Sequence, residues 1–223
     1  MKKALTLVVL IVTPSIVFAQ GGVDFGNQTG LVQQWTSSSD STLAPVPVGG
    51  GYVQLIAAPV GTALQPLGVY EGSSGFLPGY SSLAGFLAAN PGWDVPFNGY
   101  WTGPLAPAPI SGAPGRFNGG VAIIGNIGDG ADADYVVIGW TGPYATYDAA
   151  YAADLATPNS SFLGMSGIAT THTGEVVVNP GTPVALRNTF QGMTLAPDVV
   201  PEPTTVFLAG LGAVLLLLFP RRG

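Results

Sequence analysis

Three aspartates lie close together in the stretch GDGADADY: Asp129, Asp132 and Asp134. Clustered carboxylates supply the hard oxygen ligands that calcium prefers, and extracellular calcium sites with a Kd of about 10⁻⁴ to 10⁻³ M can still be occupied. The spacing differs from an EF-hand loop, because alanines stand two and four positions after Asp129. The cluster is therefore either a calcium site or an acidic hairpin tip with Asp132 and Asp134 on the solvent face of the next strand.

A second group of candidate residues is aromatic. Trp93, Phe97, Tyr100 and Trp101 lie in a region rich in Gly and Pro. Exposed rings can stack on the faces of sugars, so Trp93, Tyr100 and Trp101 could form a carbohydrate-binding surface. Aromatic residues in long loops also commonly fill the core beneath those loops. Burial of these rings would remove the sugar-binding interpretation.

Several residue types that catalysis often uses are missing or rare. Cysteine is absent and no lysine follows Lys3, which excludes a thiol nucleophile, a lysine Schiff base and a Gly-Lys-Ser/Thr phosphate loop. His172 is the only histidine, and no Gly-x-Ser-x-Gly elbow surrounds a serine. Between the two chain ends the only glutamates are Glu71 and Glu175, and no pattern pairs them as a glycosidase requires. We expect a non-enzymatic protein, without a cofactor unless the aspartates bind calcium.

The charge balance also limits the partners. Between residues 20 and 197 the only cations are Arg116 and Arg187, against ten acidic residues from Asp24 to Glu175. Nucleic-acid binding needs many cationic contacts to phosphate, so we expect no nucleic-acid partner. With no cysteine, the domain must be stabilised by its core alone.

These candidate residues must be positioned by a domain that is mainly β. Short runs of apolar and β-branched residues alternate with turn residues, in a chain with 33 Gly and 20 Pro. The strongest strand patterns are at 21–27, 51–57, 121–127, 134–141, 175–179 and 182–190. Such short strands predict a β-sandwich or a jelly-roll-like body. One helix is predicted at 146–156, with Thr146 as its N-cap, Asp148 in the first turn and Pro158 as its stop.

The N-terminus has the pattern of a secretory signal peptide. Lys2 and Lys3 precede a largely apolar stretch, and small residues stand before the bond between Ala19 and Gln20. We expect signal peptidase to cleave there. This gives three parts: a signal peptide at 1–19, an extracytoplasmic domain at 20–197 and a C-terminal segment at 198–223.

The C-terminal segment contains an unbroken apolar run from Val206 to Phe219, followed by Arg221 and Arg222. As a helix this run would be about 21 Å long, short of a hydrocarbon core of about 30 Å. Its Leu, Val and Phe content nevertheless favours insertion by roughly 3 to 6 kcal/mol. The positive-inside rule places the two arginines in the cytoplasm, so we expect a transmembrane helix in the inner membrane with the body outside.

Just before this run stands a Val-Pro-Glu-Pro-Thr motif, formed by Val200, Pro201, Glu202, Pro203 and Thr204. The motif, a short transmembrane segment and a terminal basic cluster, in this order, resemble the PEP-CTERM sorting signal of exported bacterial proteins. The resemblance implies recognition by an exosortase, a membrane enzyme that processes such tails. The stretches QGGVDFGN and YATYDAAYAADLA also resemble uncharacterised PEP-CTERM proteins of the Verrucomicrobia type.

Two functions of different class fit the sequence. The first is a non-enzymatic exported protein, sorted through its tail to the cell surface or the extracellular polysaccharide matrix, with a structural or adhesive role. The second is a secreted carbohydrate-binding or carbohydrate-active domain on the same signal. Exposure of Trp93, Tyr100 or Trp101 in a groove would favour the second.

Overall fold

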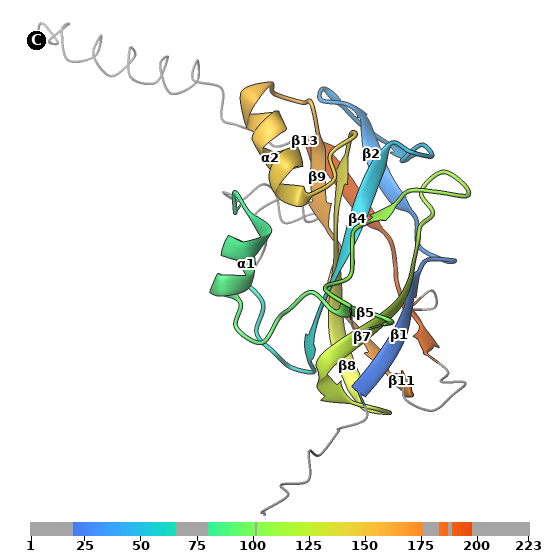
Figure 1. Cartoon of the computed structure of the whole chain (residues 1–223). Helices are drawn as coiled ribbons and strands as arrows, with labels where there is room; N and C mark the ends of the chain where they lie inside the picture. The colour runs from blue at the N-terminus through green and yellow to red at the C-terminus, as the bar shows by residue number, and fades with distance from the viewer. Residues whose placement is uncertain (1–19, 66–79, 101, 176–182, 187–188, 198–223) are drawn as a thin grey trace, which may run out of the picture.

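The computed structural model describes residues 20–65, 80–100, 102–175, 183–186 and 189–197. The predicted signal peptide at 1–19 and the predicted sorting segment at 198–223 lie outside these residues. The described body is mainly β, as the sequence predicts, with two sheets that face each other and a layer of helices on one side (Figure 1).

The smaller sheet has five strands. Its members are β11 (Gly174–Glu175), β1 (Gln20–Gly26), β7 (Asn118–Gly128) and β5 (Phe97–Asn98), in this spatial order, with β12 (Val184–Ala185) beside β1. Strands β1 and β7 form its antiparallel centre, and β12 runs parallel to β1. Strand β5 pairs with only two residues of β7, Ala122 and Ile123. The rest of this edge of β7 is therefore not covered by β5.

The larger sheet has eight strands. Their order is β3 (Asp40–Pro45), β2 (Val32–Ser37), β13 (Met193–Pro197), β9 (Phe162–Met165), β8 (Asp132–Thr141), β4 (Gly51–Pro59) and β6 (Ala108–Pro109), with β10 (Ala169–His172) also paired to β8. The central β4–β8 pair is antiparallel over nine residue pairs. Strand β13 lies parallel to β2 and antiparallel to β9. The last described strand therefore joins the β2–β3 pair to the rest of the sheet.

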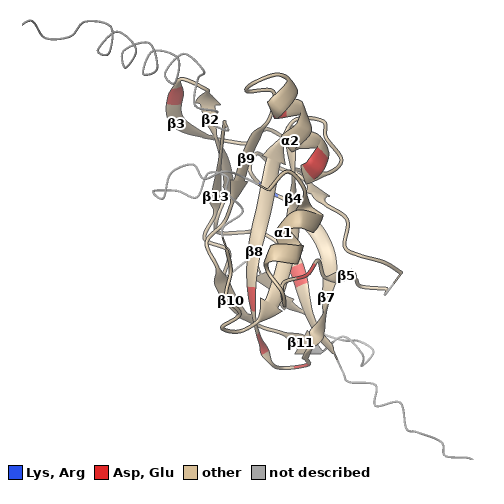
Figure 2. Ribbon diagram, turned by 90° about the vertical axis from the view of Figure 1, so that its left-hand side faces the viewer, with Lys and Arg blue, Asp and Glu red and all other residues tan. Residues whose placement is uncertain are grey.

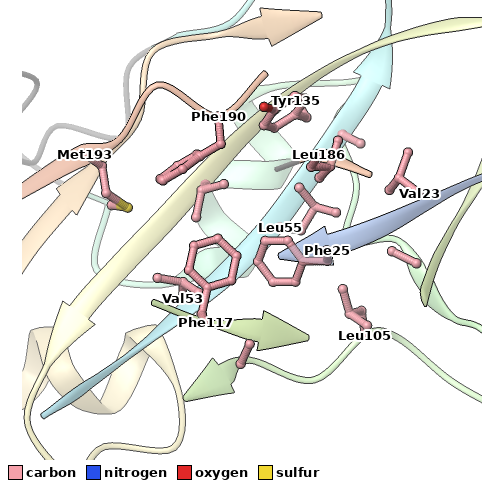
Figure 3. Packing of buried hydrophobic residues seen from close by; sticks show 14 of the residues in the cluster. Val23, Phe25, Val53, Leu55, Leu105, Phe117, Tyr135, Leu186, Phe190 and Met193 are labelled. Carbon is pink, nitrogen blue, oxygen red and sulfur yellow. The ribbon is translucent and has the colours of Figure 1, made fainter. Parts of the chain in front are cut away.

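Aromatic and branched side chains fill the space between the two sheets (Figure 3). Phe25 of β1 is fully buried, and its ring centroid lies 4.8 Å from that of Phe117. Phe117 in turn packs edge-on against Phe190, at 5.6 Å. Burying an aromatic or large aliphatic side chain contributes about 1.5 to 3 kcal/mol each, so this cluster is the main stabilising element of a domain without disulfides.

A second apolar cluster lies on the opposite face of the larger sheet. Side chains of β8 alternate between the two clusters: Tyr135 and Val137 face the smaller sheet, whereas Ile138 and Trp140 face the helices. A strand that is buried on both faces appears in the sequence as a continuous apolar run, as β8 does. The larger sheet is therefore the middle layer of three, as Figure 1 shows.

The helix layer differs from the sequence prediction. The predicted helix is confirmed as α2 (Tyr147–Ala156), whose N-cap Thr146 accepts a hydrogen bond from the Ala149 N–H. A second helix, α1 (Leu83–Ala89), was not predicted, so the expectation of a single helix is wrong. Helix α1 is short and depends on tertiary contacts: Phe86 is fully buried, and the Leu83 N–H donates to the Asp148 carboxylate of α2 at 2.7 Å.

The stability of the fold is expected to fall at high pH through Tyr135. Its side chain is buried in the inter-sheet cluster, and its hydroxyl lies 2.8 Å from Thr189 Oγ1. Burial raises the pKa of Tyr135 above its ordinary value of about 10, and the hydrogen bond to Thr189 opposes this in part. The stabilising contribution of the neutral phenol is complete below about pH 10, and it is lost as the pH rises through the pKa of the folded state.

A comparison with Tyr135→Phe measures this effect. The variant cannot ionise at this position, so the stability advantage of the wild type over the variant should shrink as the pH rises above about 10 and through the raised pKa of Tyr135. Urea unfolding at several pH values, followed by tryptophan fluorescence, gives both curves. Parallel pH dependences of the two proteins would contradict the assignment.

Candidate functional site

The structure gives the three aspartates of the predicted calcium cluster different surroundings. Asp129 lies in the turn between β7 and β8, and Asp132 lies 2.9 Å from His172 Nδ1 at the exposed end of β10. Asp134 is buried, which differs from the expected solvent-facing tip, and its carboxylate accepts hydrogen bonds from Thr170 Oγ1 and the Gly61 N–H. Among the described residues, no group of three potential metal ligands comes together.

Trp93 is buried, so this residue cannot stack on a sugar. Its side chain is 3% exposed in the cluster between the larger sheet and the helices, and its indole N–H donates to the Ala63 carbonyl at 3.1 Å. Backbone hydrogen bonds in both directions also tie the next residue, Asp94, to Ala57 of β4. Trp93 therefore anchors the segment that leads into β5.

Tyr100 is the most exposed large apolar residue of the described chain, at 88%. It stands in a loop that Asn98 organises: the Asn98 Oδ1 accepts hydrogen bonds from the backbone N–H groups of Tyr100 and Thr102, at 3.1 and 3.2 Å. The Asn98 N–H donates to the Gly103 carbonyl at 3.0 Å. Trp101, the third aromatic candidate, lies outside the described residues. These hydrogen bonds order the backbone at Tyr100, so the backbone loses little conformational entropy on binding.

A groove of about 430 Å³ lies beside this residue, and we call it the Tyr100 groove. Side chains that line it include Tyr100, Asn98, Leu105, Val121 and Pro183. The backbone of Gly99, Gly119 and Gly120 completes the described lining. None of the described lining residues carries a charge. The groove therefore offers an aromatic ring, an amide and backbone polar groups to a ligand.

A β-bulge shapes the wall of the groove. Phe25 pairs with Gly120 and Gly26 pairs with Asn118, which leaves Gly119 as the extra residue of β7. A Cβ atom on Gly119 would collide with the Phe25 ring, and Gly120 has a φ of +74°. Sequence analysis missed this feature, although Asn-Gly-Gly at the start of an apolar strand is a signal for a bulge.

The charges of the described residues lie elsewhere. Figure 2 shows acidic positions at the start of β3, in α2 and near the lower end of β8. Asp40, at the start of β3, has a pKa below its ordinary value because Thr42 and Thr36 donate hydrogen bonds to it. Arg116 is the only cation of the described residues, and its Nη1 atom is buried without a hydrogen-bond partner.

Most residues of the predicted targeting signals lie outside the described chain. Ala19 and the motif from Val200 to Thr204 belong to this group. Glu71, named above with Glu175, also lies outside the described residues. Gln20, predicted to follow the cleavage site, begins β1, and its amide donates to the Gly125 carbonyl at 2.9 Å. Neither described helix is long and apolar enough to span a bilayer.

Comparison with protein-family models, with curated proteins and with solved structures finds no match for this chain. Its function therefore has to be inferred from the chemistry of its own residues.

Proposed function

We propose that this chain is a non-enzymatic exported protein of the cell surface that adheres to neutral sugar chains through the Tyr100 groove. The observation that carries the proposal is the exposure of Tyr100 beside an uncharged groove. An exposed aromatic ring beside a groove offers a ligand an apolar face and a polar tip in one place. The loop that holds the ring is organised by Asn98, which is typical of a preformed binding site.

The chemistry of the groove favours a sugar. A pyranose presents apolar C–H faces and polar hydroxyl edges, and tyrosine offers an apolar ring with a polar tip. The amide of Asn98 and the exposed backbone at Gly119 and Gly120 supply hydrogen-bond donors and acceptors for the hydroxyl groups. The acidic body disfavours an anionic polymer through like-charge repulsion.

The same residues support a binding role without catalysis. Glycoside hydrolysis needs two carboxyl groups that flank one bond, and no carboxylate is among the described residues that line the groove. His172 contacts Asp132, and among the described residues no hydroxyl nucleophile hydrogen-bonds to its ring. An adhesive protein needs only the ring, the polar groups and a stable scaffold.

The export route follows from the sequence. Signal peptidase would remove residues 1–19, and the C-terminal helix would hold the protein in the inner membrane. An exosortase-type enzyme would then read Val200 to Thr204 and release the protein to the envelope surface or the extracellular polysaccharide. A sugar-binding groove suits a protein delivered to such a matrix.

Affinity electrophoresis tests the proposed binding. The full-length chain, in a non-ionic detergent without a sugar head group, is run in native gels that contain dextran, laminarin or hydroxyethylcellulose, with alginate as the acidic polymer. At least one neutral polymer should retard the protein. Tyr100→Ala should weaken this retardation tenfold or more, because truncation of a central aromatic contact costs more than about 1 to 2 kcal/mol.

Two control variants identify the ring as the cause. Tyr100→Phe keeps the ring and should retain most of the retardation. Leu155→Ala removes a side chain that is 56% exposed on α2, in the helix layer, and should behave as wild type. If none of these neutral polymers retards the wild type, or if Tyr100→Ala binds as well as wild type, the proposal is wrong.

A further inference from the structure

A second cavity lies beside β5 and β7, and reaches Gln20 of β1 and Ala57 of β4. It has a volume of about 190 Å³, and its lining includes Phe97, Asp94, Gln20, Gly125 and Asn126. A further hollow of about 310 Å³ shares the last three of these residues. We call the 190 Å³ cavity the Phe97 cavity.

The position of β5 explains why there are two cavities. Strand β5 covers β7 only at Ala122 and Ile123. The Tyr100 groove is lined by residues 119–121, just before the covered pair, and the Phe97 cavity by residues 124–126, just after it. The five residue-to-residue steps from Gly120 to Gly125 span about 17 Å of strand. A linear polymer several units long could therefore contact both cavities.

The Phe97 cavity resembles the Tyr100 groove in its chemistry. The Phe97 side chain is 37% exposed and lies against Gly125, where a Cβ atom would be 3.2 Å from the ring. The absent side chain of Gly125 leaves the ring accessible. Amides of Gln20 and Asn126 stand beside it. An aromatic ring with an amide group beside it therefore occurs on each side of the two β7 residues that β5 covers.

The charge of the Phe97 cavity is negative. Asp94 Oδ1 accepts a hydrogen bond from the Val95 N–H at 2.8 Å, and Oδ2 accepts none from the described residues. A free carboxylate oxygen is a good acceptor for sugar hydroxyl groups. No cation is among the described lining residues of either cavity. This combination favours a neutral ligand over an acidic one.

The shape of the β7 edge disfavours a peptide as the ligand. A peptide strand that adds to a sheet needs a regular series of backbone donors and acceptors. The pairing of β7 with β1, on the opposite edge of β7, is irregular at Gly119 and between Ile124 and Gly128. The extra residues belong to β7 itself, so they also interrupt the regular series of backbone groups on its other edge. Such bulges are a common protection against strand addition. A sugar chain has no such repeat to match.

We infer that the two cavities are subsites of one binding edge, which takes an internal stretch of a neutral polysaccharide across β5. This inference rests on the proposed function, since it assumes that the Tyr100 groove binds sugar. Tyr100 and Phe97 each cover one part of the bound chain. Affinity then depends on chain length, because a short oligosaccharide fills only one subsite.

The test measures binding against chain length. Gluco-oligosaccharides prepared from whichever neutral polymer retards the protein, from the disaccharide upward, are titrated calorimetrically into the full-length chain. The affinity of the wild type should rise at least tenfold over the series and then level off. Phe97→Ala should bind the shortest binding oligosaccharide as wild type does, and lose most of the gain with length.

Two variants separate this result from a folding defect and from the proposed function. Phe97→Leu keeps an apolar side chain for packing, and should show the same loss as Phe97→Ala with an unchanged melting temperature. A wild-type affinity independent of length, or a gain that Phe97→Leu retains, would overturn the second subsite while Tyr100-dependent binding remains. A failure of every neutral sugar to bind would overturn both proposals.

Discussion

Gly164→Ala should destabilise the fold strongly. Gly164 lies in β9, between β8 and β13, and a Cβ atom there would collide with the Thr194 carbonyl oxygen and come within 3.0 Å of Leu195 Cδ2. The oxygen belongs to the backbone of a central strand, so the contact can be relieved only by moving β13 away from the sheet. Overpacking of flexible side chains already costs about 1 to 3 kcal/mol. We expect a loss of at least about 3 kcal/mol, a large part of the stability of an ordinary domain.

Gly167→Ala provides the matched control for this substitution. Gly167 follows β9 closely in the chain, but no atom lies within 4 Å of the Cβ position, and its φ is not positive. The control should therefore differ from wild type by less than about 0.5 kcal/mol. Urea unfolding midpoints measure both variants. Equal stability of the two would show that the sheet is not packed as described at Gly164.

Trp140→Ala should cost about 3 to 5 kcal/mol, the usual range for removing a buried aromatic side chain. The Trp140 side chain is 1% exposed, and its indole N–H donates to the Tyr144 carbonyl at 2.7 Å. Its ring centroid lies 6.3 Å from those of Tyr52 and Tyr147, so it joins β4 and β8 to α2. Its removal leaves a cavity beneath the helix layer and an unpaired carbonyl.

Two measurements distinguish this loss from a general weakening. Trp140→Phe restores most of the volume without the N–H group, and should recover more than half of the lost stability. Tyr100→Ala removes an aromatic side chain that is 88% exposed, and should leave the stability nearly unchanged. Similar losses for Trp140→Ala and Tyr100→Ala would contradict the assignment of the helix-side cluster.

Local signals explain which elements could be predicted from the sequence. Helix α2 has an N-cap, an acidic first turn and a following proline, all within its own residues. Helix α1 has only seven residues, among them Gly85, and its stabilising contacts come from Asp148 and the second cluster. Strands β2 and β3 are rich in Gln, Ser and Thr, so they lack an apolar alternation that could be recognised.

The candidate site was predictable only in part, because burial of a loop aromatic depends on distant residues. Trp93 and Tyr100 have similar local surroundings in the sequence, yet Trp93 is held by Ala63 whereas Tyr100 points outward. Asp134 becomes buried through Thr170 and Gly61, which are far from it in the chain. The pattern of apolar residues within one strand does not reveal which side chains distant residues will bury. By contrast, the Asn-Gly-Gly bulge at the groove could have been recognised locally.

The pairing of β13 with β2 also determines the order in which the fold can be completed. Met193, near the end of the described chain, pairs with Val32, near its beginning, and Val184 of β12 pairs with Val23 of β1. When the first strands of a chain pair with the last ones, the contact order is high. Domains of this kind fold slowly, within milliseconds to seconds. While the chain is synthesised from its N-terminus, β1 and β2 therefore have unpaired edges until the later strands are made, and a chaperone bound to these edges would protect them from aggregation.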